Sequence, residues 1–142
     1  MVLILLAAAA SDARAADYAR YPAAIVRHLR PVSPPLTDAR LRENRTALRA
    51  AARQRPDFAG HWVLATIGCG ASCIQPAALD RLTGRVVWFP ATLCCWPLTV
   101  SEPLSYRINS RLLVVEGDLN EQEPSRIRRY VFDGRRFAPL PD

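Results

Sequence analysis

Lysine is absent from this chain of 142 residues, and all nineteen of its basic residues are arginine. A surface that binds phosphate normally mixes both residue types, because lysine also serves well as a point charge. The net charge of +6 therefore does not predict a nucleic-acid partner, and an arginine-only composition is more typical of a coding bias. Most of the excess charge lies in residues 16–60, where nine arginines face four acidic residues.

Signatures of several other protein classes are missing as well. No apolar run reaches the roughly 18 residues of a membrane span. The sequence contains no glycine-rich phosphate loop, internal repeat or low-complexity tract, and no C-x-x-C motif in a βαβ context. It has only two histidines, His28 and His61, as candidate general bases. We therefore expect no transmembrane segment, no cofactor and no metal ion.

The N-terminus has the pattern of a secretory signal peptide. An apolar segment, Val2–Ala10, is followed by Ala13-Arg14-Ala15, which fits the A-x-A cleavage pattern. We expect residues 1–15 to be removed and the protein to be exported to the periplasm or the extracellular space. The basic residues that usually open a signal peptide are missing, so either the α-amine supplies that charge or the start codon lies upstream.

An extended arm and one helix are expected next. Three prolines in Pro31–Pro35 favour polyproline II geometry, which predicts an extended arm over residues 16–36. Thr37-Asp38 offers an N-cap for a helix over about 38–54, rich in strong helix formers and ended by Pro56. The apolar positions of this helix form a narrow stripe suited to lying on a sheet: Leu41, Leu48, Ala51 and Ala52.

The opposite face of the predicted helix carries a basic ridge, formed by Arg42, Arg45, Arg49 and Arg53. Such a ridge can dock onto phosphate, lipid headgroups or an acidic partner. It can equally be a solvated face, which is the usual role of like charges on one helix. We favour the solvated face.

After Gly60 the sequence predicts short antiparallel strands. Asp80–Gly84 and Asp133-Gly134 are hairpin signals, and turn residues recur at a spacing of about ten. Residues 37–142 are therefore expected to form one mainly β domain behind the N-terminal helix. We expect a meander of about six or seven strands, forming a small barrel or a curled sheet. The strands are placed at 61–67, 73–79, 85–89, 104–108, 112–116, 126–132 and 135–138, with an acidic loop at 118–125.

All four cysteines are expected at one end of this sheet. If the turn centres at 82–83, the numbers of paired residues on its two strands sum to about 165. Cys73 then faces about residue 92, and Cys94 faces about residue 71. The loop that holds Cys69 and Cys73 should therefore lie beside Cys94 and Cys95.

Three interpretations of this cluster remain open. Exported proteins usually pair four cysteines in two disulfides. These bonds can be crossed between the loop and the Cys94-Cys95 pair, or local, with Cys69–Cys73 closed and the other two cysteines forming a vicinal bond or free thiols. A four-thiolate zinc site has the right number of ligands but an unusual spacing. A cysteine-dependent enzyme or thiol-redox protein would use the GCGASC loop, although neither His28 nor His61 is placed to serve as its base.

Three motifs occur in order: PDFAGHW at 56–62, GCGASC at 68–73 and DRLTGRV at 80–86. Together they resemble the FAGH[YW]…GCGxxC…DxxTGxV core of a family of small exported bacterial proteins of unknown function. The resemblance covers about residues 37–140. The usual residues of that family at three positions are Asn, Tyr and Trp, where this sequence has Asp57, Trp62 and Ile67. The Cys94-Cys95 pair is not part of the resemblance. The resemblance implies an exported location and the architecture, and no activity.

We interpret the chain as an exported, disulfide-stapled β domain that works by binding. An envelope protein, a cell-wall fragment or a secreted enzyme that it inhibits are the expected kinds of partner. No acid–base pair of residues stands out, and His61 is most simply a packed strand residue. Trp96 is expected to be exposed, because it lies between Cys95 and Pro97 in a loop. The candidate binding rim consists of Gly68, Gly70, Ser72, Trp96, His61 and Trp62.

Overall fold

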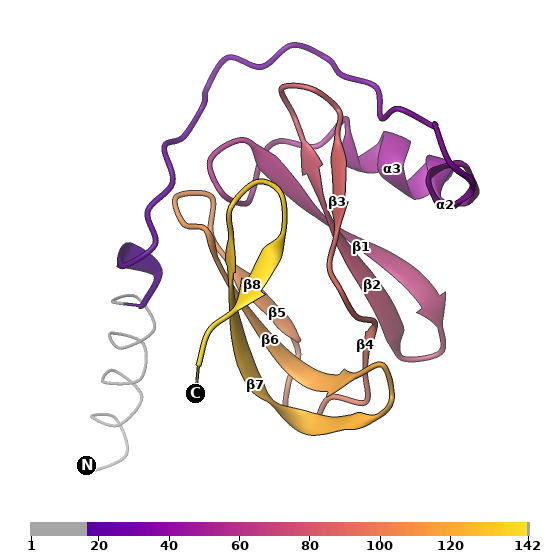
Figure 1. The fold of residues 1–142 in the computed structure, drawn as a ribbon, viewed down its shortest axis with the longest axis vertical. Helices are drawn as coiled ribbons and strands as arrows, with labels where there is room; N and C mark the ends of the chain where they lie inside the picture. Colours follow the sequence, from indigo (N-terminus) through magenta and orange to yellow (C-terminus); the bar gives the residue numbers. More distant parts are fainter. Residues whose placement is uncertain (1–16, 142) are drawn as a thin grey trace.

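The computed structural model describes residues 17–141, which form a mainly β fold (Figure 1). The predicted signal peptide and its cleavage site lie outside the described residues. Within them, eight strands make one antiparallel sheet with the order β1-β2-β4-β6-β7-β8, while β3 pairs with β2 and β5 with β6. The strands are β1 Trp62–Gly70, β2 Cys73–Asp80, β3 Val86–Trp88, β4 Leu93–Cys94, β5 Leu104–Tyr106, β6 Leu112–Leu119, β7 Glu123–Phe132 and β8 Phe137–Pro139.

The sheet is curled but open, because β1 and β8 stand at its two ends and do not pair with each other. The barrel expected as one alternative is therefore wrong, and the sheet has more strands than expected. The extra strand is β4, whose two residues are too short to leave a pattern in the sequence. The acidic loop expected at 118–125 is also wrong, because β6 and β7 continue through it to a tight turn at 120–122.

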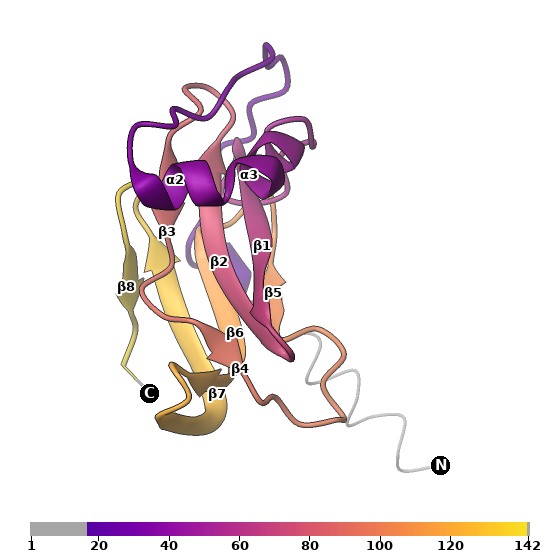
Figure 2. The same cartoon turned by 90° about the vertical axis from the view of Figure 1, so that its right-hand side faces the viewer.

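Two hydrophobic cores lie on opposite faces of the sheet. The main core fills the curl and is rich in aromatic side chains, among them Phe58, Phe89 and Phe132. The second core lies between the outer face of β1 and β2 and the helical layer. Figure 2 shows the helices lying across these two strands. The predicted apolar stripe is confirmed, since all four of its residues are buried in this second core.

The expected helix over 38–54 is broken into α2 (Ala39–Glu43) and α3 (Arg45–Ala51). The predicted N-cap is confirmed, because Asp38 accepts a hydrogen bond from the Leu41 amide at 2.9 Å. The break lies at Asn44, whose Nδ2 donates to the Arg40 carbonyl at 2.8 Å. Asparagine competes in this way with helical hydrogen bonds, which explains why a sequence of good helix formers still gives two short helices.

The N-terminal arm is extended after a helical turn at 17–19, and it packs along the domain. The Ala23 amide donates to the Asn109 carbonyl at 2.9 Å, and the Val26 amide donates to the Gly60 carbonyl at 3.1 Å. The buried Ser110 hydroxyl donates to the Tyr18 carbonyl at 2.8 Å. The arm is thus held against the β domain by its backbone.

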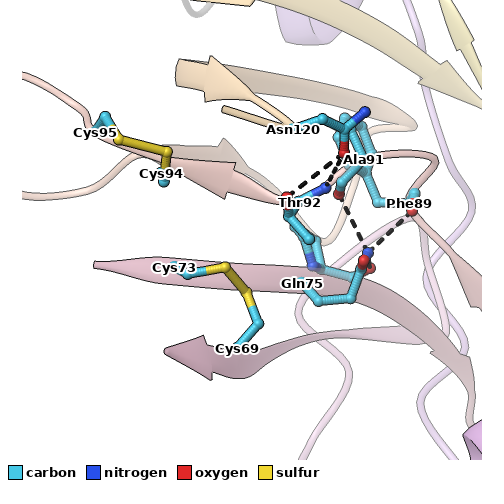
Figure 3. Close-up of a disulfide and its surroundings, with 10 residues drawn as sticks. Cys69, Cys73, Gln75, Phe89, Ala91, Thr92, Cys94, Cys95 and Asn120 are labelled. Atoms are coloured by element: carbon cyan, nitrogen blue, oxygen red, sulfur yellow. Dashed lines mark hydrogen bonds between the residues drawn. A yellow bond between two sulfur atoms is a disulfide. The ribbon is translucent and has the colours of Figure 1, made fainter. Parts of the chain in front are cut away.

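The predicted register of the β2–β3 hairpin is confirmed: Ala77 pairs with Trp88 and Leu79 pairs with Val86, so the pairs sum to 165. The register shifts by two residues at β4, where Cys73 lies opposite Cys94. The shift arises because the chain leaves the strand ladder at residues 89–92, between the end of β3 and the start of β4. We call this segment the detour before β4. Figure 3 shows the Gln75 side chain reaching from β2 to this detour, where its Nε2 donates to the carbonyls of Phe89 at 3.0 Å and Ala91 at 3.2 Å.

Candidate functional site

The residues of the candidate binding rim do not form one site. Gly68, Gly70 and Ser72 are exposed at the tip of the β1–β2 hairpin. His61 and Trp62 stand at the opposite end of β1, roughly 25 Å from that tip along the strand. The structure therefore separates the glycine-rich loop from Trp62 and from His61, which lies in the turn before β1 and not in the strand as expected.

The aromatic residues of the rim are largely structural. Trp62 is buried and packs edge-on against Phe132, with ring centroids 4.7 Å apart. Trp96, expected to be exposed, is half-buried and packs against the main core. His61 is half-buried, with Nε2 3.5 Å from Asp80 Oδ1. The same carboxylate caps its turn, because it accepts hydrogen bonds from the Leu82 amide and the Thr83 hydroxyl.

The basic ridge is divided by the helix break. All four of its arginines are exposed, and they follow the outer side of α2, α3 and the turn after them. Arg42 Nη1 lies 3.5 Å from the Leu36 carbonyl, and Arg45 Nη1 donates to the Arg42 carbonyl at 3.1 Å. Two of the four guanidinium groups thus contact backbone oxygens of the same layer.

The cysteines form two local disulfides, Cys69–Cys73 and Cys94–Cys95. The clustering predicted from register is confirmed, because Cys73 pairs with Cys94 across β2 and β4. The crossed connectivity is wrong, and of the alternatives left open the vicinal bond is found. None of the four cysteines is free, so a disulfide would have to be reduced before any of them could serve as a nucleophilic or zinc-binding thiolate.

Asp118 extends the cysteine cluster by one strand, because it pairs with Cys94 across β4 and β6. One of its carboxylate oxygens and the sulfurs of Cys94 and Cys95 all lie within 4.8 Å of one another. If the vicinal bond were reduced, this group of two sulfurs and one oxygen could hold a metal ion. In the disulfide form the sulfurs are not thiolate ligands.

A cavity of about 450 Å³ opens beside the main core. The detour before β4 supplies Pro90 and Ala91 to one wall, and the turn at 120–122 supplies Asn120. Asn120 Oδ1 accepts a hydrogen bond from the Thr92 amide at 3.0 Å, which ties the two segments together (Figure 3). The remaining lining residues come from β6, β7, the end of β8 and the segment after it: Leu119, Glu123, Arg126, Arg128, Arg129, Tyr130, Pro139, Leu140 and Pro141.

Polar groups on β7 converge on this cavity. Arg126, Arg128 and Tyr130 alternate along the strand and therefore share one face of it. The Tyr130 ring packs edge-on against Phe89 at 4.8 Å, and burial raises the pKa of its hydroxyl. Polar groups that converge opposite apolar wall residues are a feature of ligand sites.

Arg128 is the most unusual of these groups, since its side chain is buried. Its guanidinium donates to the carbonyls of Gly117 at 3.1 Å and Pro124 at 3.0 Å. It also lies 3.3 Å from a carboxylate oxygen of Glu123, whose side chain is exposed. Within the described part of the chain, the buried Arg128 Nε has no hydrogen-bond partner.

A second group of interest lies where the open edge of β1 approaches β5. Asp57 Oδ1 accepts a hydrogen bond from the Leu64 amide at 2.9 Å, and Oδ2 lies 3.4 Å from the Tyr106 hydroxyl. Burial raises the pKa of Asp57, although its two hydrogen bonds oppose the shift. Burial and the nearby Asp57 charge raise the pKa of Tyr106 to about 12.

Replacing Asp57 with asparagine is expected to stabilise the protein at neutral pH. Burial raises the pKa of Asp57 in the folded state above its unfolded value of 3.8. The ionised carboxylate therefore destabilises the folded protein above the raised pKa, whereas below 3.8 the group is protonated in both states and has no such effect. The gain should be at most about 1 kcal/mol, since the group is partly solvated. Urea unfolding at several pH values should show that the stability gain of the variant over the wild type vanishes as the pH falls towards 3.8. The pKa of Tyr106, followed by ultraviolet absorbance, should fall.

The chain was compared with protein-family models, with curated proteins and with solved structures. None of them matches it. The resemblance to a family of exported proteins, carried by three short motifs, therefore stays a prediction.

Proposed function

We propose that the chain is an exported binding module, and that its ligand occupies the cavity beside Tyr130. The observation that carries this proposal is the cavity itself, which at about 450 Å³ lies within the size range of ligand pockets. The hydrogen bonds of Gln75 and Asn120 hold two of its wall segments in place, the detour before β4 and the turn at 120–122. A preformed site of this kind loses little conformational freedom when it binds.

The lining favours a ligand that carries a carboxylate on an apolar body. Three arginines of β7 line the cavity against one acidic residue, Glu123, so the lining carries a net positive charge that suits a carboxylate. The proline and leucine residues of the opposite wall suit an apolar group. A short acidic peptide segment, from an envelope protein or from the peptide part of the cell wall, fits this chemistry.

Export is part of this proposal. Two disulfides in a small domain support it, because such bonds persist mainly in oxidising compartments. None of the helices in residues 17–141 is long and apolar enough to cross a membrane.

Binding in the cavity is expected to fail when the cavity is filled. We expect acidic peptides and peptidoglycan stem peptides to shift the backbone amide resonances of Asn120, Tyr130 and Leu140 in ¹H–¹⁵N NMR titrations. Ala91→Phe should weaken this binding at least tenfold, because the larger ring occupies the ligand's space. The melting temperature of the variant shows whether it remains folded.

Ala71→Phe is the matched control, since Ala71 is exposed at the hairpin tip, away from the cavity lining. It should bind the same peptides with unchanged affinity. Resonance shifts confined to residues 68–72, or equal affinities of the Ala91→Phe variant and the wild type, would show that the cavity is not the binding site.

A further inference from the structure

The two disulfides lie on neighbouring strands, in a position that permits a third connection. Cys73 and Cys94 are directly opposed across β2 and β4. Opposed residues of an antiparallel pair have Cα atoms about 4.5 to 5.5 Å apart, which is within the range that a disulfide spans. A Cys73–Cys94 bond therefore needs no backbone rearrangement. Figure 3 shows both existing bonds at this end of the sheet.

The directions of the side chains agree with this connection. The next pair in the register, Ile74 and Leu93, both belong to the side of the sheet that packs on the main core. Because side chains alternate along a strand, Cys73 and Cys94 both point to the opposite face. Asp118, paired with Cys94, continues the same row on β6.

Solvent reaches the four cysteines unequally. Cys95 and Cys69 are exposed, Cys73 is half-buried, and Cys94 has only 3% of its surface exposed. Cys95 also adopts a positive φ of 55°, an uncommon conformation for a residue with a side chain. An external thiolate can therefore reach the vicinal bond at Cys95, while the sulfur that leaves is Cys94, the one beside Cys73.

We propose that the two disulfides form a thiol-exchange site whose substrate is an exposed thiol of a peptide or small molecule. The substrate thiolate attacks Cys95 Sγ, so that a mixed disulfide forms and the Cys94 thiolate leaves. The Cys94 thiolate then attacks Cys73 Sγ, which forms the Cys73–Cys94 bond and releases the Cys69 thiolate. Cys69 takes up the proton that the substrate thiol lost, so atoms and electrons balance without another reactant.

Asp118 restrains the second step. Its carboxylate lies beside the Cys94 and Cys95 sulfurs, and a negative charge disfavours a thiolate next to it. Asp118→Asn should therefore speed the appearance of the Cys69 thiol several-fold at neutral pH, with the same final products. A role that is only structural would leave this rate unchanged.

The sharpest test is the disulfide map of Cys95→Ser, which leaves a permanent thiol at Cys94. Peptide mapping by mass spectrometry after alkylation should find the Cys73–Cys94 bond and a labelled Cys69. An intact Cys69–Cys73 bond with the label on Cys94 would overturn the proposal. Cys94→Ser is the matched control, where Cys69–Cys73 should remain closed and the label should appear on Cys95.

A second measurement uses the unaltered protein, so the test does not depend on a variant folding. Reduced glutathione, added in small excess, should give a glutathione adduct on Cys95 and at least tenfold more alkylation of Cys69 than in the untreated sample. An adduct accompanied by a free Cys94, or no adduct until the protein unfolds in urea, contradicts the proposal. Peptide binding in the cavity is read separately by NMR and does not enter either outcome.

Discussion

Gly84→Ala is expected to destabilise the protein by roughly 2–4 kcal/mol, because two separate costs add at this position. The backbone has a φ of +81°, which a side chain makes unfavourable by about 1–2 kcal/mol. A Cβ placed there also collides with the Ser33 carbonyl oxygen and lies 3.0 Å from its carbon. Because these atoms are backbone, the arm itself must move. Urea denaturation followed by circular dichroism measures the loss.

Gly60 lies equally close to the backbone of the arm at a second point, Ala24. Its φ is +88°, and its added Cβ would meet the Ala24 carbonyl oxygen. Gly68→Ala is the control, because no atom lies within 4 Å of its added Cβ, and it should cost no stability. If Gly84→Ala and Gly68→Ala unfolded at the same urea concentration, the arm would not be packed on the hairpin turn in solution.

These contacts show which parts of the fold follow from local sequence. The Asp38 cap, the Asp80–Gly84 turn and the register of the hairpin around it depend on residues close together in the chain, and all three are confirmed. The packing of the arm depends on carbonyl oxygens meeting two glycines far along the sequence. No pattern of residue types in an extended, proline-containing segment specifies such a contact.

The detour before β4 limited the prediction of the cysteine cluster in a similar way. Simple hairpin counting brings the four cysteines together, but it misses the two-residue shift that sets Cys73 opposite Cys94. Pro76 and Pro90 lack amide hydrogens, and the Gln75 side chain donates to carbonyls there instead. Such side-chain substitution for a ladder hydrogen bond is a tertiary event that hydrophobic periodicity does not reveal.

The cavity was missed for another physical reason. Its lining residues on β7 include the buried Arg128, whereas the neighbouring Ile127 on the other face is exposed. An alternating pattern normally places the apolar residue inside, so the sequence of β7 predicts the wrong face for this segment. β7 reverses the usual alternation of buried apolar and exposed polar residues beside the cavity. Such local disagreement between sequence pattern and fold tends to mark functional sites.

Phe58→Ala is expected to cost about 3–5 kcal/mol, as large aromatic truncations in cores do. Phe58 is fully buried, and its ring lies 5.4 Å from Phe132 and 6.2 Å from Phe137 between centroids. It also meets the Tyr106 ring edge-on at 6.0 Å. The side chain thus joins β5, β7 and β8 to the residues just before β1, across the open side of the curl.

The size of this loss shows whether the aromatic cluster holds the open sheet in its curled shape or only covers the inner face of the sheet. Domains of this size are typically stable by only about 5–15 kcal/mol, so the Phe58→Ala variant should lose a large share of its stability. Leu98→Ala is the control, because Leu98 is fully exposed and its truncation should change stability by less than about 0.5 kcal/mol. Equal unfolding midpoints for the two variants would contradict this account, since the open sheet would then hold its shape without the aromatic cluster.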